Sequence, residues 1–185
     1  TTSGVDLSWQ REFYEDLHRH PELSHEEERT AGRILEKLRA FDCEIVDSIG
    51  GHGIVAIFRN GDGPTALMRA DFDGLPVAEE TGVDFAATNG KMHACGHDGH
   101  SATLLASARQ LAATRQFSGT VHFIFQPAEE NLGGARRMVE EGLFQRFPMD
   151  AIYAMHNWPG LPLGSLAVNP GAMMASLDSF EITLH

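Results

Sequence analysis

The order of helix-like and strand-like segments most strongly constrains what this chain can fold into. Apolar residues at helical spacing predict helices from about Ser8 to His20, from Ser24 onward, over 99–113 and over 135–141. Short apolar runs predict strands at 53–58, 64–68, 121–125 and 151–155, and two further strands at 165–168 and 179–184. Strands that alternate with helices predict an α/β fold, a three-layer sandwich around a mixed, mostly parallel central sheet.

Local signals refine these elements. The turn Asn60-Gly-Asp-Gly63 predicts a hairpin that joins the strands on either side of it. Ser24, with Glu27 three residues later, predicts a capping box at the start of the second helix. Asp98 is expected to cap the third helix.

Composition and charge exclude several classes of partner. The chain has 185 residues and a formal charge of −12, which repels phosphate backbones and anionic membrane surfaces. We therefore expect neither nucleic acid nor membrane as a partner. The two cysteines, Cys43 and Cys95, are too few for a disulfide framework, and the first residues lack a signal-peptide pattern. A cytoplasmic location is expected.

Polar residues gather at the ends of the predicted strands. In open α/β sheets, ligands bind at the carboxyl ends of the strands. We expect the side chains there to converge, because each cluster supplies a carboxylate, an imidazole or a thiol at a loop. The four clusters contain Asp71 with Asp73, Cys95 with His97, Glu129 with Glu130, and His156.

The pair Cys95 and His97 indicates a transition metal. A thiolate and a neutral imidazole together favour an ion such as zinc over magnesium or calcium. Taken alone, a buried free cysteine beside a surface histidine is the commoner situation. Cys95 as a covalent nucleophile beside His97 is the chemical alternative, but it leaves Glu129, Glu130 and His156 unexplained.

The adjacent carboxylates of Glu129 and Glu130 can divide two tasks. Just past a strand, neighbouring side chains still point in opposite directions, so one can bind metal while the other faces substrate. Two adjacent glutamates in a solvated loop are the usual alternative, and Pro127 makes the positioned pair more plausible. Asp71 and Asp73 could each orient a ligand histidine or cap a turn, and for Asp71 the two interpretations are even.

The remaining histidines give weaker signals. His100 falls inside a predicted helix and is interpreted as structural. For the others that stand apart from the clusters, no partner is visible in the sequence: His18, His20, His25, His52 and His122.

Several segments resemble those of a known enzyme family. They are similar to the aminoacylase and carboxypeptidase G-like metallopeptidases, in the subgroup of hippurate hydrolases, N-acyl-L-amino-acid amidohydrolases and auxin-conjugate hydrolases. The resemblance runs in order along essentially the whole chain, and the cysteine-histidine motif is specific to the subgroup. The matching segments are 18–24, 68–76, 91–100, 126–130 and 154–158.

The resemblance implies a site for two divalent metal ions, Zn²⁺ or Mn²⁺, with Co²⁺ or Ni²⁺ also possible. Cys95 would take the bridging position, and Glu129 would be the general base. Asp73 matches an aspartate that orients a ligand histidine. The implied activity is hydrolysis of the amide bond of small N-acyl amino acids, which releases a carboxylic acid and an amino acid. The implied metal ligands are Cys95, His97, Glu130 and His156.

The resemblance also implies how the chain is organised. Residues 1–178 would form the N-terminal part of a zinc-peptidase-like catalytic domain. Residues 179–185 would begin an inserted lid and dimerisation domain, so that the fold is cut before the lid. A further metal-binding histidine would lie beyond His185, and the parent enzyme would be a homodimer or larger homo-oligomer.

Two other functions remain open at this point. The parent enzyme could be a dipeptidase or carboxypeptidase of the same family. Alternatively, the 185 residues alone could be an inactive metal-binding fragment, and we expect weak metal occupancy and little turnover from them.

Overall fold

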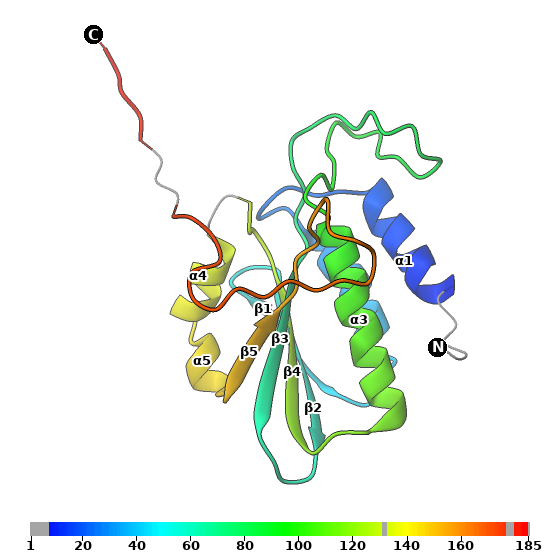
Figure 1. The fold of residues 1–185 in the computed structure, drawn as a ribbon, viewed down its shortest axis with the longest axis vertical. Helices are drawn as coiled ribbons and strands as arrows, with labels where there is room; N and C mark the ends of the chain where they lie inside the picture. Colours follow the sequence, from blue (N-terminus) through cyan, green and yellow to red (C-terminus); the bar gives the residue numbers. More distant parts are fainter. Residues whose placement is uncertain (1–7, 131–132, 177–179, 185) are drawn as a thin grey trace.

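The computed structural model describes residues 8–130, 133–176 and 180–184 (Figure 1). Its helices are α1 Ser8–Arg19, α2 Glu28–Leu38, α3 His97–Thr114, α4 Gly134–Glu140 and α5 Leu143–Arg146. Its strands are β1 Glu44–Ile49, β2 Gly53–Asn60, β3 Thr65–Asp71, β4 Gly119–Gln126 and β5 Ala151–Ala154. Within these described ranges, no helix is long and apolar enough to cross a membrane.

The strands form one mixed sheet in the order β1-β2-β4-β3-β5. The pairs β1–β2 and β2–β4 are antiparallel, whereas β3–β4 and β3–β5 are parallel. Helices α1 to α3 cover one face of the sheet, and α4 and α5 cover the other (Figure 1). The predicted α/β fold with three layers and a mixed sheet is confirmed.

The predicted hairpin is wrong. β2 and β3 do not pair with each other, because β4 lies between them and bonds to both. The turn after β2 instead wraps around the start of β4, where Asn60 pairs with Gly119. A side chain at Gly119 would lie 2.1 Å from the carbonyl oxygen of Pro64, so only glycine allows this close approach. The chain does turn at 60–63, but β2 and β3 each pair with the apolar strand β4 instead of with each other.

Both predicted helix caps are also wrong. α2 begins at Glu28, and Ser24 donates a hydrogen bond to Asp73 instead of capping it. The carboxylate of Glu22 takes the capping role, because it accepts the N–H groups of two residues in the first turn, at 3.1 and 2.7 Å. Asp98 lies inside the first turn of α3, after the N-cap Gly96.

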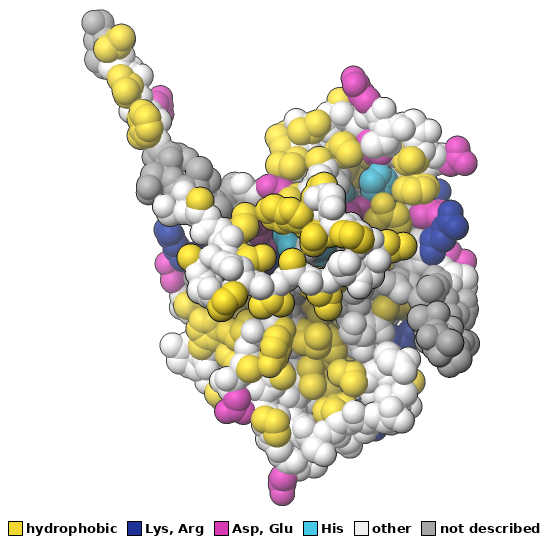
Figure 2. Space-filling view, in the orientation of Figure 1, with side chains coloured by type: hydrophobic (Ala, Val, Ile, Leu, Met, Phe, Trp, Pro, Cys, Tyr) yellow, Lys and Arg dark blue, Asp and Glu magenta, His cyan; other side chains and the backbone are white. Residues whose placement is uncertain are grey.

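The segment after β5 runs over the surface. Residues 165–168 and 180–184 form no strand, so two predictions fail there; Ser179 lies outside the described residues. Every residue from 152 to 176 is exposed, including Tyr153 and Trp158. Figure 2 shows hydrophobic side chains gathered on this face over β5 and along the segment that follows it.

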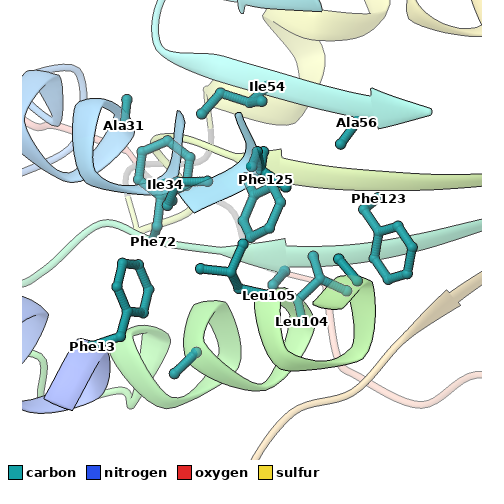
Figure 3. Packing of buried hydrophobic residues seen from close by; sticks show 14 of the residues in the cluster. Phe13, Ala31, Ile34, Ile54, Ala56, Phe72, Leu104, Leu105, Phe123 and Phe125 are labelled. Carbon is teal, nitrogen blue, oxygen red and sulfur yellow. The ribbon is translucent and has the colours of Figure 1, made fainter. Parts of the chain in front are cut away.

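Alternate residues of the central strands pack into separate cores on the two faces. In β2, Ile54 and Ala56 face α1 to α3 and belong to the same cluster as Phe125 and Leu105 (Figure 3). Val55 of the same strand faces α4 and α5. Burying one such side chain stabilises the fold by about 1.5–3 kcal/mol. Because β4 is buried on both faces, the loop that leaves it starts from a rigid strand.

Candidate metal centre

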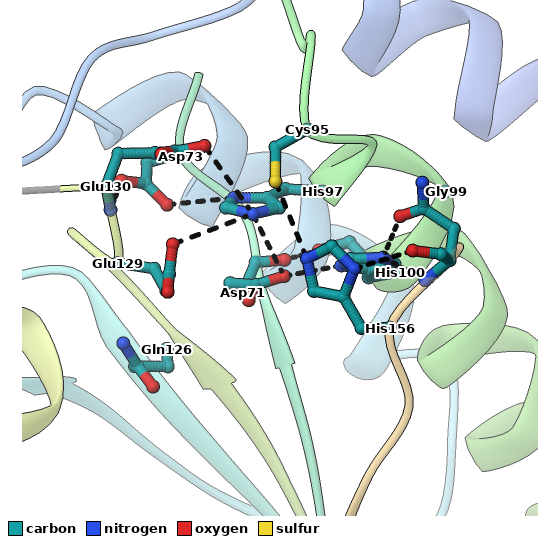
Figure 4. A network of polar contacts seen from close by, with 12 residues as sticks. Asp71, Asp73, Cys95, His97, Gly99, His100, Gln126, Glu129, Glu130 and His156 are labelled. Carbon is teal, nitrogen blue, oxygen red and sulfur yellow. Dashed lines mark hydrogen bonds and ion pairs between the residues drawn. The ribbon is translucent and has the colours of Figure 1, made fainter. Parts of the chain in front are cut away.

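The polar clusters meet at one edge of the sheet. β3 and β4 run parallel and end side by side, with Asp71 paired to Gln126. β5 runs parallel to β3 on its other side. Because the carboxyl ends of parallel strands share an edge, the loops after these strands and the start of α3 converge there (Figure 4). The predicted convergence is therefore observed.

The ring of His97 lies at the middle of the cluster. Its Nε2 is 3.8 Å from Oε1 of Glu130 and 3.9 Å from Oε2 of Glu129. Sγ of Cys95 lies 3.5 Å from Nε2 of His156. Three overlapping groups that share His97 each offer ligand atoms within 4.8 Å of one another: Cys95 with His97 and His156, Asp71 with His97 and His100, and His97 with Glu129 and Glu130.

Unpaired atoms in this cluster suit a cation. His97 Nε2 and Glu130 Oε1 are buried and have no hydrogen-bond partner among the described residues. Leaving such a group unpaired costs about 1–3 kcal/mol, so the arrangement calls for something that pairs with both. A thiol, two imidazoles and a carboxylate are the donors that zinc and similar divalent ions prefer. The residues present fit such an ion.

Asp73 fixes the orientation of His97. Its Oδ1 lies 3.1 Å from His97 Nδ1, which directs Nε2 toward the glutamates. Its Oδ2 accepts hydrogen bonds from the Ser24 hydroxyl at 2.7 Å and from the Glu130 N–H at 2.9 Å. Burial would raise the pKa of Asp73, but these bonds hold it below the usual value. The carboxylate is therefore charged and ties His97 to the turn that carries Glu130.

A second network of hydrogen bonds, from Asp71 through His100 to Asn157, was not predicted from the sequence. Asp71 Oδ1 lies 2.7 Å from Nδ1 of His100, and the N–H of Asn157 donates to His100 Nε2 at 3.1 Å. The rings of His100 and His156 lie 4.4 Å apart. His100 thus anchors the loop that carries His156. The i, i+3 spacing of His97 and His100 could have indicated it, because this spacing puts both rings on one face of α3.

Asp71 itself is held between two cationic or donating groups. Its Oδ2 accepts from the Arg69 guanidinium at 2.7 Å. Burial would raise the pKa of Asp71, but the bond to His100 and the charge of Arg69 hold it far below its usual range. In the described structure both carboxylate oxygens of Asp71 thus bond to side chains, an arrangement that favours orienting His100 over capping a turn.

The charge balance of the cluster disfavours a reactive thiolate. Burial and the carboxylates of Glu130, Glu129 and Asp71 raise the pKa of Cys95 to about 12. A nucleophilic cysteine needs the opposite shift, so the covalent alternative loses support. Burial lowers the pKa of His97, but the nearby carboxylates outweigh it and the net shift is upward. A cluster this rich in negative charge attracts cations.

Two other histidines have surroundings that the sequence did not reveal. His18 bridges two carboxylates, with Nδ1 2.6 Å from Asp98 and Nε2 3.0 Å from Glu79. These partners lie 80 and 61 positions away, which is why no local pattern indicated them. His93 is buried with neither ring nitrogen paired within the described part of the chain, and burial lowers its pKa.

Known proteins are similar to this chain in sequence and in fold. The model of peptidase family M20/M25/M40 matches residues 67–185. The N-acetylcysteine deacetylase of Bacillus subtilis is 44% identical over 173 residues, which are 91% of this chain and 45% of that protein. The hippurate hydrolase of Campylobacter jejuni is 41% identical over 168 residues, 90% of this chain and 44% of that protein.

Two further relatives widen the comparison. Thermostable carboxypeptidase 2 of Saccharolobus solfataricus is 38% identical over 96% of this chain and 46% of its own. The crystal structure of the Bacillus subtilis YXEP protein, described as a dinuclear metal binding peptidase, superposes with a TM-score of 0.80 and 42% identity. That match covers 85% of this chain and 45% of the other.

The chain thus spans a little under half the length of the relatives that it matches. The family match covers β3, α3, β4 and β5, the elements whose ends carry the cluster. With its sequence, its fold and this cluster in agreement, the chain belongs to peptidase family M20/M25/M40.

Proposed function

We propose that the protein containing this chain hydrolyses the amide bond of N-acyl amino acids in a metal-dependent reaction. The products are a carboxylic acid and an amino acid. The observation that carries the proposal is the set of donor atoms around Nε2 of His97, which has no hydrogen-bond partner in the described part of the chain. Relatives named N-acetylcysteine deacetylase and hippurate hydrolase support this class of substrate.

We assign the metal ligands to Cys95, His97, Glu130 and His156. Two bound divalent ions, Zn²⁺ or Mn²⁺ in the first instance and Co²⁺ or Ni²⁺ as substitutes, would supply Lewis acidity that polarises the amide carbonyl and acidifies water. The donor set supports this assignment, because thiolate and imidazole select borderline transition metals. Asp73 and Asp71 orient the imidazoles of His97 and His100 from behind.

Glu129 is the proposed general base. Its side chain is 38% exposed, whereas the His97 ring beside it is completely buried. A carboxylate on the open side of the cluster can reach both a water and the substrate nitrogen. It takes a proton from the attacking water and passes it to the departing amine.

We also propose the domain division and the partners. Residues 1–178 belong to the catalytic domain and residues 179–185 to the start of a lid and dimerisation domain. The partner is a small N-acyl amino acid, and the enzyme is a homodimer or larger homo-oligomer. Nucleic acid and membrane are not partners, because the net charge is −12. The free cysteines Cys43 and Cys95 support a cytoplasmic location.

A substrate panel tests the proposed activity. The natural protein at its full length is stripped of metal, reloaded with Zn²⁺, Mn²⁺ or Co²⁺, and assayed with hippurate, N-acetyl amino acids and dipeptides. We expect hydrolysis of the acylated amino acids that depends on reloading. Faster hydrolysis of dipeptides would favour the peptidase alternative, which the carboxypeptidase relative supports. The same assay on the 185-residue chain alone tests our expectation of little turnover, and robust turnover would contradict it.

A further inference from the structure

A buried glutamate outside the proposed catalytic set contacts the turn that carries the two catalytic-site glutamates. Glu27 is completely buried, and its Oε1 accepts the N–H of Ala128 at 2.7 Å. The two residues are 101 positions apart in the sequence. The other carboxyl oxygen, Oε2, is buried without a hydrogen-bond partner among the described residues. Burying a carboxyl group that is only partly hydrogen-bonded is costly, so packing alone does not account for a glutamate here.

The residue that Glu27 holds has an unusual backbone conformation. Ala128 has a φ of +52°, in the left-handed region that residues other than glycine rarely adopt. Its N–H is bonded to Glu27, and its carbonyl oxygen accepts the N–H of Gly134 at 3.0 Å. Because Ala128 directly precedes Glu129, its conformation sets the direction of the chain at Glu129 and Glu130.

The same N-terminal segment also supports the other side of the turn. Ser24 donates to Asp73 Oδ2, the oxygen that accepts the Glu130 N–H. Residues 22–27 therefore touch the turn through Glu27 and touch the carboxylate behind His97 through Ser24. The turn is held from two directions by a segment that contributes no donor to the metal cluster.

We propose that Glu27 is a positioning residue for Glu129 and Glu130. Its carboxyl oxygen holds Ala128 in the left-handed conformation, and that conformation aims Glu130 at the metal cluster and Glu129 at its open side. The consequence for turnover rests on the proposed function, whereas the consequence for metal affinity does not.

Two variants of one residue isolate the hydrogen bond. Glu27→Met fills a similar volume but cannot accept the N–H of Ala128, whereas Glu27→Gln keeps an acceptor oxygen. Burial raises the pKa of Glu27. The amide of glutamine has nearly the same shape and removes the charge while it keeps the acceptor. Glu26→Met is the matched control, because the Glu26 side chain is 62% exposed and, among the described residues, pairs with Lys91 alone.

The readouts are Co²⁺ affinity from absorption spectra, and kcat and KM, in the natural protein at its full length. We expect Glu27→Met to weaken Co²⁺ binding about 10–100-fold and to lower kcat about 100-fold with little change in KM. Glu27→Gln should stay within about threefold of the wild type in both, and so should Glu26→Met. Equal behaviour of Glu27→Met and Glu27→Gln would overturn the proposal.

A second substitution tests the route through Ala128. Glycine adopts a positive φ without strain, so Ala128→Gly should restore part of the Co²⁺ affinity and kcat in the Glu27→Met background. If Glu27→Met alone does not fold, recovery of both folding and Co²⁺ affinity in the double variant supports the proposal, and no recovery overturns it. If the wild type hydrolyses none of the substrates, the proposed function fails, but the Co²⁺ titrations still decide the role of Glu27.

Discussion

The two sides of the metal cluster are built differently. On the inner side, Asp73, Asp71 and His100 have side chains 0%, 1% and 4% exposed, and their polar atoms are bonded to other protein groups. On the outer side, Glu130 and Glu129 are 20% and 38% exposed, and an oxygen of Glu130 lacks a partner within the described residues. The inner side is thus fixed by the protein alone, whereas the outer side leaves groups with which the proposed ion and substrate would pair.

The largest expected effect comes from the outer side. Glu129→Gln removes the proton acceptor but leaves the inner side and the other donors in place. We expect kcat for an N-acyl amino acid to fall about 10²–10⁴-fold, because this is the usual contribution of general acid–base catalysis. Metal content, measured by elemental analysis, should not change. Glu140→Gln on the exposed face of α4 is the control. A Glu129→Gln enzyme with near-normal kcat would remove the role assigned to Glu129.

A substitution on the inner side should change the affinity for metal more directly than it changes the catalytic step. His100→Gln breaks the link from Asp71 to Asn157 and loosens the loop that carries His156. We expect Co²⁺ affinity to fall about 10–100-fold, as for other groups that support metal ligands. Calorimetric titration measures it, with His52→Gln as the control. Unchanged affinity would mean that the packing of α3 alone positions His156.

The smallest expected effect concerns stability. Burial lowers the pKa of His18, but its bonds to Glu79 and Asp98 outweigh this, so the folded-state pKa lies above the unfolded value of 6.5. The stability that His18 adds is therefore fully present below the unfolded value and is lost as the pH rises through the folded value. The pH range in which this stability is lost therefore lies above the unfolded pKa.

Urea unfolding of the metal-free protein at about pH 6 and about pH 9 measures this loss. We expect the unfolding free energy of the wild type to be lower at the higher pH. The unfolding free energy of His18→Gln should decrease less between the same two pH values. His20→Gln, an exposed neighbour, should behave as the wild type does. A His18→Gln protein with the full pH dependence would place the titrating group elsewhere.

The sequence predicted the parts of the site that depend on local order. Apolar runs mark the strands, and polar residues at or just after their ends indicate the clusters at Asp71, Glu129 and His156. The cluster of Cys95 and His97 lies instead at the start of α3. A parallel sheet brings such ends to one edge, and this rule needs no knowledge of side-chain packing.

What escaped prediction depends on contacts between distant segments. The hairpin failed because a turn signal says nothing about a third strand, and β4 begins 56 positions after the end of that turn. His18 with Asp98, and Glu27 with Ala128, are 80 and 101 positions apart, so neither pair has a local signature. The strand predicted at 165–168 failed because no neighbouring strand in the described structure bonds to it.

The position of β4 between β2 and β3 has a consequence for how the molecule forms. β1 and β2 can pair as soon as they are synthesised, but β3 has no partner until β4 or β5 follows. β4 then joins an antiparallel half of the sheet to a parallel half. Pairing between strands that are distant in the sequence is a slow step in folding. An interrupted or mispaired β4 would leave the β1–β2 pair separate from the β3–β5 pair, and Asp71 at the end of β3 would lose its neighbour Gln126. The cluster can therefore assemble only after β4 has joined the two halves of the sheet.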